Sequence, residues 1–97
     1  MYAVIGRWSV DPSREDEQSR ELHAVIVPMI SGRPGFVAGY WSRDPETGRG
    51  HTTVVWETEE SARDFKEMVD ERRQLAATFG VTNDFLVVTD VLADAHR

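Results

Sequence analysis

Hydrophobic positions along the chain follow two different periods. Four short runs, over residues 2–10, 36–43, 51–57 and 84–92, are rich in β-branched and aromatic residues and are bounded by turn residues, which is typical of strands. The segments after the first and the third run carry apolar residues at spacings of three and four, as amphipathic helices do. The pattern therefore predicts the order β-α-β-β-α-β, an α+β ferredoxin-like arrangement with one four-stranded antiparallel sheet.

Polar residues, prolines and glycines predict where the two helices begin and end. Ser13 is expected to cap the first helix, with Asp16 in the reciprocal position of a capping box. Pro28 has no amide hydrogen and disfavours helical geometry in the residue before it, so we expect this helix to end or bend there. Thr58 is expected to cap the second helix, and Gly80 to supply its left-handed stop.

Each helix is expected to bury one apolar stripe. In the first helix the stripe comprises Leu22, Val25, Ile26 and Met29. In the second helix it comprises Ala62, Phe65, Val69, Ala76 and Phe79. Because βαβ crossovers are right-handed, both stripes lie against the same face of the sheet, and the other face is left without a helix.

Both faces of the predicted sheet carry apolar side chains. Strict alternation in the second strand predicts two sets on opposite faces: Phe36, Ala38 and Tyr40, and Val37, Gly39 and Trp41. A sheet with one solvated face would instead alternate between apolar and polar residues. A free apolar face of this size exceeds what soluble monomers usually expose. We therefore expect a homodimer in which two copies of the chain pack sheet against sheet.

Length, charge and composition narrow the range of functions. The 97 residues predict one domain, with residues 93–97 as a polar tail. The net charge of −6, from 17 acidic and 11 basic residues, makes nucleic acid or an acidic membrane surface a poor partner. The absence of cysteine excludes disulfides and thiolate chemistry. No apolar run approaches the roughly 20 residues that span a bilayer, and no secretory leader precedes the first strand, so a cytoplasmic protein is expected.

Two stretches of the sequence resemble a known superfamily. PGFVAGYW after the first helix and VVWETEESARDF from the third strand into the second helix are similar to the dimeric α+β barrel proteins, and most closely to antibiotic-biosynthesis-monooxygenase-like domains. The resemblance covers roughly residues 2–92. It implies a dimer whose two sheets form a barrel, with a ligand cavity between sheet and helices in each subunit. Some relatives oxidise phenols or quinols with dioxygen and no cofactor, and others degrade haem.

The haem-degrading relatives provide a residue-by-residue test. They carry an asparagine on the first strand, a tryptophan at the end of the third strand, and a histidine on the second helix that ligates iron. Trp56 matches the tryptophan, but the asparagine position falls at or near Gly6, and no histidine occurs between Glu59 and Phe79. We therefore expect neither haem nor another cofactor. No H-x-H or H-x₃-H pair occurs in the sequence, so we also expect no metal site.

An aromatic cavity between sheet and helices is the candidate substrate-binding site. With Trp56 facing the helices, as the resemblance implies, a hairpin register that pairs Ala38 with Trp56 would add Phe36 and Tyr40 to this face. Gly6 would leave space in the floor of the cavity, and Phe65 reaches the same space from the second helix. The competing interpretation is that the rings fill the core, since each buries about 150–250 Å² in a domain that has few of them.

His23, Tyr40 and Arg7 are the polar candidates. His23, at the edge of the apolar stripe of the first helix, could act as a general base because imidazole titrates near neutrality. The alternative for His23 is a half-exposed position on the helix flank. Tyr40 could donate a hydrogen bond to the substrate, and Arg7 could pair with a carboxylate or phenolate, or with an acid across the dimer. His51 is expected to be a surface residue beside the loop.

Two functions of different classes follow from these residues. The first is a cofactor-independent monooxygenase acting on an aromatic or quinone-like small molecule, with His23 as base, Arg7 or Tyr40 as oxyanion partner and Trp56 as stacking wall. The second is a non-catalytic dimer that binds a small ligand, or a stress-response accessory protein. The aromatic strands and Gly6 favour the first function. The absence of a compact acid–base constellation favours the second.

Overall fold

The computed structural model describes residues 1–97. Its strands are β1 (Tyr2–Val10), β2 (Phe36–Arg43), β3 (Gly50–Trp56) and β4 (Val81–Asp90). Between β1 and β2 the chain forms a 3₁₀ turn η1 (Pro12–Arg14), helix α1 (Glu15–Glu21), a π-helical segment η2 (Leu22–Ile26) and helix α2 (Val27–Ser31). Between β3 and β4 it forms helices α3 (Glu59–Glu71) and α4 (Arg73–Thr78). None of these helices is long and apolar enough to cross a membrane.

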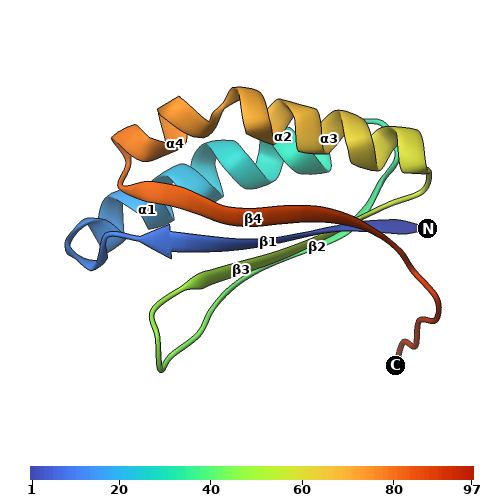
Figure 1. Ribbon diagram of the computed structural model, residues 1–97, viewed down its shortest axis with the longest axis horizontal. Coiled ribbons are helices and arrows are strands. Elements are labelled where there is room, and N and C mark those ends of the chain that lie inside the picture. Colours follow the sequence, from blue (N-terminus) through green and yellow to red (C-terminus); the bar gives the residue numbers. More distant parts are fainter.

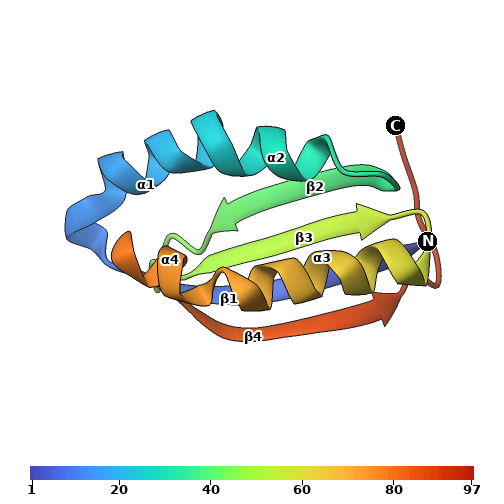
Figure 2. The same cartoon turned by 90° about the horizontal axis from the view of Figure 1, so that it is seen from above.

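The four strands form one antiparallel sheet in the order β2-β3-β1-β4. Figure 1 shows both helical segments on the same face of this sheet. Seen from above in Figure 2, α1 and α2 follow β2, while α3 and α4 run over β1. The α+β ferredoxin-like fold predicted from the hydrophobic pattern is confirmed. We call the face of the sheet without helices the open face.

Asp11 caps the first helical segment. Its Oδ1 atom accepts hydrogen bonds from the backbone N–H of Ser13 at 3.0 Å and from Ser13 Oγ at 2.7 Å. These bonds favour the carboxylate and hold the pKa of Asp11 below its ordinary value. The predicted cap at Ser13 with Asp16 is wrong, because Asp11 precedes Pro12, which is well placed for the first position of a helical turn.

Pro28 is accommodated by a wider turn in the preceding residues. The segment η2 is π-helical, and the N–H of Val27 donates to the carbonyl of Leu22, five residues earlier. An α-helix at this point would place the ring of Pro28 against a carbonyl of the preceding turn, and the extra residue of a π turn changes that contact. The helical path therefore continues to Ser31 instead of ending at the proline.

The π-helical segment also changes which residues of the first helix face the sheet. Ile26 and Met29 pack against the core, as predicted. Val25 is 40% exposed and points away from the sheet. The predicted apolar stripe is therefore wrong at Val25, because a 3.6-residue period does not hold through a π turn.

Strand β2 contains one extra residue relative to β3. Phe36 pairs with Trp56, but Ala38 pairs with Val55, so Val37 is left without a partner in the register. Such a β-bulge interrupts the alternation of side chains between the two faces. Every residue after Val37 therefore lies on the face opposite to the one that counting from Phe36 predicts.

The bulge separates Tyr40 from the helices and places Trp41 under them. Trp41 pairs with Thr52 and packs against the buried core. Tyr40 is 69% exposed and lies on the open face. The predicted orientation is right for Phe36, which precedes the extra residue, and wrong for Tyr40 and Trp41, which follow it.

The second helical segment begins and ends where the sequence predicts. Thr58 Oγ1 accepts a hydrogen bond from the N–H of Ser61 at 3.1 Å, so Thr58 is the N-cap of α3. Gly80 has a φ of 76°, the left-handed conformation expected after the helix. Arg72 interrupts the segment between α3 and α4 with non-helical dihedrals of φ −97° and ψ 8°.

The buried core occupies one end of the space between sheet and helices. Trp56 is completely buried, and its ring lies 5.8 Å from that of Phe36 and 5.0 Å from that of Phe65, measured between centroids. The rest of the buried cluster comprises Val4, Ile30, Val54, Ala62 and Leu86. The indole N–H of Trp56 has no hydrogen-bond partner, so this ring stabilises the fold by packing alone.

The open face carries large apolar side chains that nothing in the chain covers. Val37, Tyr40, Phe85 and Val87 are each at least 39% exposed. Residues 91–97 form neither helix nor strand, and Figure 1 shows them leaving the sheet on the side away from the helices.

Candidate functional site

An apolar cavity of about 410 Å³ lies between the helices and the half of the sheet that the core leaves uncovered. Its floor includes strand residues that face the helices: Trp8, Val10, Trp41, Thr52 and Val81. Its walls include apolar residues from both helical segments: Leu22, Ile26, Met29, Met68, Val69, Leu75, Ala76 and Phe79. A concave, mainly apolar space of this size is typical of a small-molecule site.

Two indole rings form the centre of the floor. Trp8 Nε1 donates a hydrogen bond to Thr52 Oγ1 at 3.2 Å, which satisfies the indole N–H and orients the ring. The ring of Trp41 lies against Gly39, where an added Cβ would be only 2.7 Å from it. A side chain at position 39 would therefore displace the ring of Trp41. The two rings offer flat apolar surfaces on which a planar ligand can stack.

Gly6 permits the contact between Trp8 and Thr52. A Cβ on Gly6 would lie 2.9 Å from Leu86 Cδ1 and from Thr52 Oγ1, and 3.0 Å from Trp8 Nε1. Gly6 is itself buried and does not line the cavity. The space that its missing side chain leaves is thus filled by neighbouring side chains, and Gly6 positions the floor instead of opening it.

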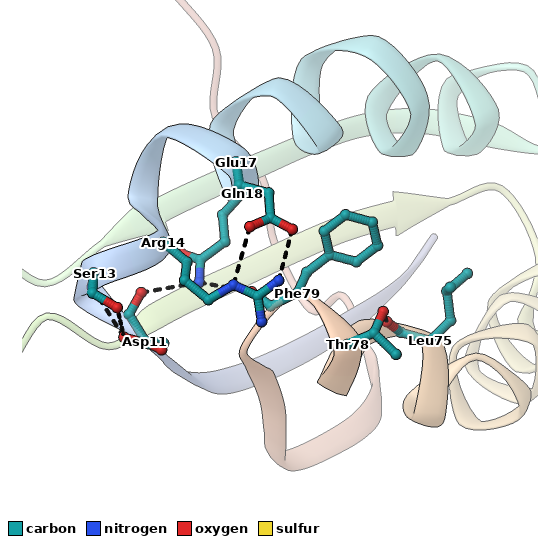
Figure 3. A network of polar contacts seen from close by, with 8 residues as sticks. All are labelled: Asp11, Ser13, Arg14, Glu17, Gln18, Leu75, Thr78 and Phe79. Carbon is teal, nitrogen blue, oxygen red and sulfur yellow. Dashed lines mark hydrogen bonds and ion pairs between the residues drawn. The ribbon is translucent and has the colours of Figure 1, made fainter.

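A side-chain amide closes the end of the cavity between α1 and α4. Gln18, which lines the cavity, donates through Nε2 to the carbonyls of Asp11 and Phe79, both at 3.0 Å. Figure 3 shows this amide beside the ion pair of Arg14 and Glu17. The Arg14 guanidinium, which donates to the Glu17 carboxylate, holds the pKa of Glu17 below its ordinary value. Hydrogen bonds therefore join the two helical segments at this end.

Four charged residues lie at the rim of the cavity: Glu15, Glu21, Arg43 and Arg72. Arg43 Nη1 forms an ion pair with Glu15 Oε1. Neither Glu21 nor Arg72 has an ion-pair partner within the chain. The cavity thus combines an apolar interior with a rim that holds both signs of charge.

The aromatic residues predicted to bind substrate lie in the core. Trp56 contacts both Phe36 and Phe65, and none of the three lines the cavity. Their packing is that of the competing interpretation, in which the rings hold the sheet and the helices together. These rings fill one end of the space between sheet and helices, and the cavity begins beside them.

The histidines do not direct an imidazole into the cavity. His23 is exposed on η2, and its Nδ1 lies 2.9 Å from the carbonyl oxygen of Ser19. His51 contributes to the lining, but it precedes Thr52 in β3, and alternation sends its exposed side chain to the open face. His96 pairs with Asp94 in the tail.

Arg7 and Tyr40 lie on the open face, away from the cavity. Arg7 Nε is 3.3 Å from Asp84 Oδ2, close enough for an ion pair but without the geometry of a hydrogen bond. The Arg7 guanidinium also lies 5.3 Å from the ring centroid of Phe85, a cation–π distance. The structure thus groups Arg7 with an acid and an aromatic ring of its own chain.

The sequence interpretation missed the two rings that form the floor. Trp8 follows Val4 and Gly6 on the helix-facing side of β1, so alternation alone could have identified it. Trp41 could not have been identified in this way, because the extra residue at Val37 carries no distinctive signal in the sequence.

A family profile and several solved structures are similar to this chain. The profile described as antibiotic biosynthesis monooxygenase matches residues 1–72. No curated protein matches the sequence.

Three of the similar solved structures are bacterial proteins. The monooxygenase ActVA-Orf6 of Streptomyces coelicolor, solved with nanaomycin D, is 15% identical with a TM-score of 0.70, over 99% of this chain and 92% of that one. A variant of SnoaB, a cofactor-independent oxygenase of Streptomyces nogalater, is 15% identical with a TM-score of 0.72, over 96% and 94%. The haem degrader MhuD of Mycobacterium tuberculosis, solved with two haems in its active site, is 18% identical with a TM-score of 0.71, over 99% and 100%. At these identities the likeness is one of fold.

The residues around the cavity do not fit a haem. Helices α3 and α4 contain no histidine, and the imidazole of His51 is directed to the open face. No group of three or more histidine, aspartate or glutamate side chains is placed to hold a metal ion. An iron in the cavity would therefore find no imidazole as its axial ligand.

The packing around Gly6 predicts that Gly6→Ala destabilises the protein. The added methyl group has to displace Trp8, Thr52 or Leu86, so we expect a loss of about 1–3 kcal/mol in the free energy of unfolding and a change in tryptophan emission. Urea unfolding followed by fluorescence measures both effects. Gly50→Ala is the matched control, because the nearest atom to its added Cβ is 3.5 Å away. Equal effects of the two substitutions would contradict the packing described for the floor.

Proposed function

The chain belongs to the antibiotic biosynthesis monooxygenase family, and from this premise we propose that it is a cofactor-independent monooxygenase of an aromatic or quinone-like small molecule. The observation that carries the proposal is the apolar cavity with Trp8 and Trp41 on its floor. Its volume of about 410 Å³ suits a planar molecule of a few fused rings. The similar fold of the oxygenases ActVA-Orf6 and SnoaB supports the same reaction class.

In this proposal the protein orients the substrate and excludes water. An electron-rich substrate anion reacts with dioxygen directly, so the protein supplies a dry, shaped space for the reaction. Trp8 and Trp41 hold the ring system, and the hydrogen bond from Trp8 to Thr52 fixes one of these two rings. The amide of Gln18 closes one end of the space.

Proton removal is assigned to a carboxylate at the rim. His23 and Tyr40, the candidates from the sequence, lie outside the cavity. Glu15 is held by Arg43, whereas Glu21 lines the cavity without an ion-pair partner. Glu21 is therefore the carboxylate available to accept the substrate proton.

We also propose that two copies of the chain pack through their open faces. The support is the set of exposed apolar residues Val37, Tyr40, Phe85 and Val87 on a surface that the chain leaves uncovered. Burial of this surface removes apolar area from water in both copies at once. The cavity lies on the other side of the sheet, so each subunit keeps its own site.

A second function is supported by the shortage of groups for acid–base catalysis inside the cavity. No tyrosine lines the cavity, the imidazole of the lining residue His51 is directed to the open face, and the carboxylates lie at the rim. A non-catalytic dimer that binds a small aromatic ligand needs only the apolar walls and the two indole rings. Binding of an aromatic ligand without oxygen consumption would favour this second function.

Filling the cavity tests whether it is the site of reaction. We expect the protein to consume oxygen with at least one member of a panel of quinols and phenols, measured with an oxygen electrode. Ala76→Phe places a ring in the cavity and is expected to lower the uptake about tenfold or more, because the substrate can no longer be positioned.

Ala77→Phe is the matched control for this experiment. Ala77 is exposed on the same helix and does not line the cavity, so its substitution is expected to leave the uptake unchanged. Equal loss in both variants, or no loss in either, would contradict the assignment of the cavity as the reaction site. No uptake with any substrate would support the binding function instead.

A charge on the open face tests the proposed dimer. Val87→Glu buries a carboxylate in the interface between two sheets and is expected to convert a dimer into a monomer in sedimentation experiments. Val25→Glu is the matched control, because Val25 is similarly exposed but lies on the first helical segment. A wild-type protein that sediments as a monomer, or a Val87→Glu variant that remains dimeric, would contradict the proposal.

A further inference from the structure

An ion pair stands at the boundary between two spaces of different polarity. Glu15 in the first turn of α1 and Arg43 at the end of β2 both line the apolar cavity. Both also line a neighbouring recess of about 540 Å³, which the loop after β2 completes and of whose eight lining residues only one is hydrophobic. The pair therefore lies where the apolar cavity meets a more polar recess.

The ion pair of Glu15 and Arg43 can separate at a small cost in free energy. Both side chains are 55% exposed, and an exposed ion pair contributes little to stability because water solvates the separated charges well. No other acid forms an ion pair with Arg43. Glu17 is held by Arg14, and the Asp44 carboxylate accepts the backbone N–H of Glu46, which keeps the pKa of Asp44 below its ordinary value.

Opening of the pair changes the charge of the cavity rim. Arg72, at the break between α3 and α4, lines the same cavity and has no ion-pair partner. With Glu15 turned into solvent, the rim carries Arg43 and Arg72 against the single carboxylate of Glu21, so its net charge is positive. A neutral aromatic ligand would desolvate these guanidinium groups without replacing their lost hydration. A ligand with an anionic group would compensate them.

We infer that the cavity takes an aromatic molecule bearing an anionic group, and that this group replaces the Glu15 carboxylate on Arg43. This rests on the proposed function in that the ligand occupies the same cavity, but it concerns binding and requires no reaction. Arg43 is then the residue that recognises the anion, and Glu15 is an internal competitor that selects against neutral aromatic molecules. The two residues affect anion binding in opposite directions.

Two fluorescent probes of nearly equal shape test this inference. 8-Anilinonaphthalene-1-sulfonate is an aromatic anion, and N-phenyl-1-naphthylamine is its neutral counterpart without the sulfonate. We expect Glu15→Gln to tighten binding of the anionic probe about fivefold, because the competitor for Arg43 is removed. We expect Arg43→Gln to weaken it about fivefold, and the double variant to behave like Arg43→Gln. The dissociation constant of the neutral probe is expected to stay within about twofold in all three variants.

The controls use another exposed ion pair and the filled cavity. Glu59 and Arg63 form an exposed ion pair on α3 that does not line the cavity, so Glu59→Gln and Arg63→Gln are expected to leave both probes unaffected. Ala76→Phe is expected to weaken both probes. If it leaves the anionic probe unaffected, that probe binds elsewhere and the inference is wrong.

The inference depends on Glu15→Gln and Arg43→Gln changing the affinity for the anionic probe in opposite directions. Changes in the same direction for Glu15→Gln and Arg43→Gln, or equal changes for the neutral probe, would overturn the inference. Because equilibrium binding is measured, a protein without oxygenase activity can still show the predicted pattern. Conversely, the probe experiment can fail while the protein still consumes oxygen and Arg43→Gln leaves this uptake unchanged. That result would support the proposed function and show that the inferred anion selectivity is wrong.

Discussion

The structure depends on the packing of Trp56 between Phe36 and Phe65. These three rings join the edge strand β2, the inner strand β3 and the helix α3 at one end of the molecule. The contact is apolar, and Trp56 is completely buried. At the other end the helical segments are connected through Gln18, whose amide bonds to the backbone on both sides. The space between sheet and helices is therefore filled at the first end and hollow towards the second, and this division positions the candidate site.

Much of the fold could be predicted because it follows from patterns that act locally. The apolar runs that form the four strands, the cap at Thr58 and the glycine stop at Gly80 each depend on the chemistry of a few neighbouring residues. The predictions that depend on a regular period fail where one residue is added to the element. The π-helical segment turns Val25 outward, and the bulge at Val37 exchanges the faces of Tyr40 and Trp41. Both additions change the period on which the prediction depends.

The candidate site is harder to predict for the same physical reason. Whether a ring belongs to the core or to a cavity depends on its position along the sheet, which alternation does not report. Trp56 and Trp8 face the same side of the sheet, yet Trp56 is enclosed by other rings and Trp8 lines the cavity. Gly6 is a second example of what the sequence pattern cannot predict. A missing side chain in a strand indicates a close approach, but only the structure shows that Trp8, Thr52 and Leu86 occupy the space.

The position of the site can be tested most directly through the three indole N–H groups of the protein. In a ¹H–¹⁵N spectrum, N-phenyl-1-naphthylamine in the cavity is expected to shift the indole resonances of Trp8 and Trp41, because both rings line the cavity. The resonance of Trp56 is expected to stay in place, because its ring lies within the core. A shift at Trp56 with no change at Trp8 and Trp41 would contradict the assignment of the site to this end of the sheet.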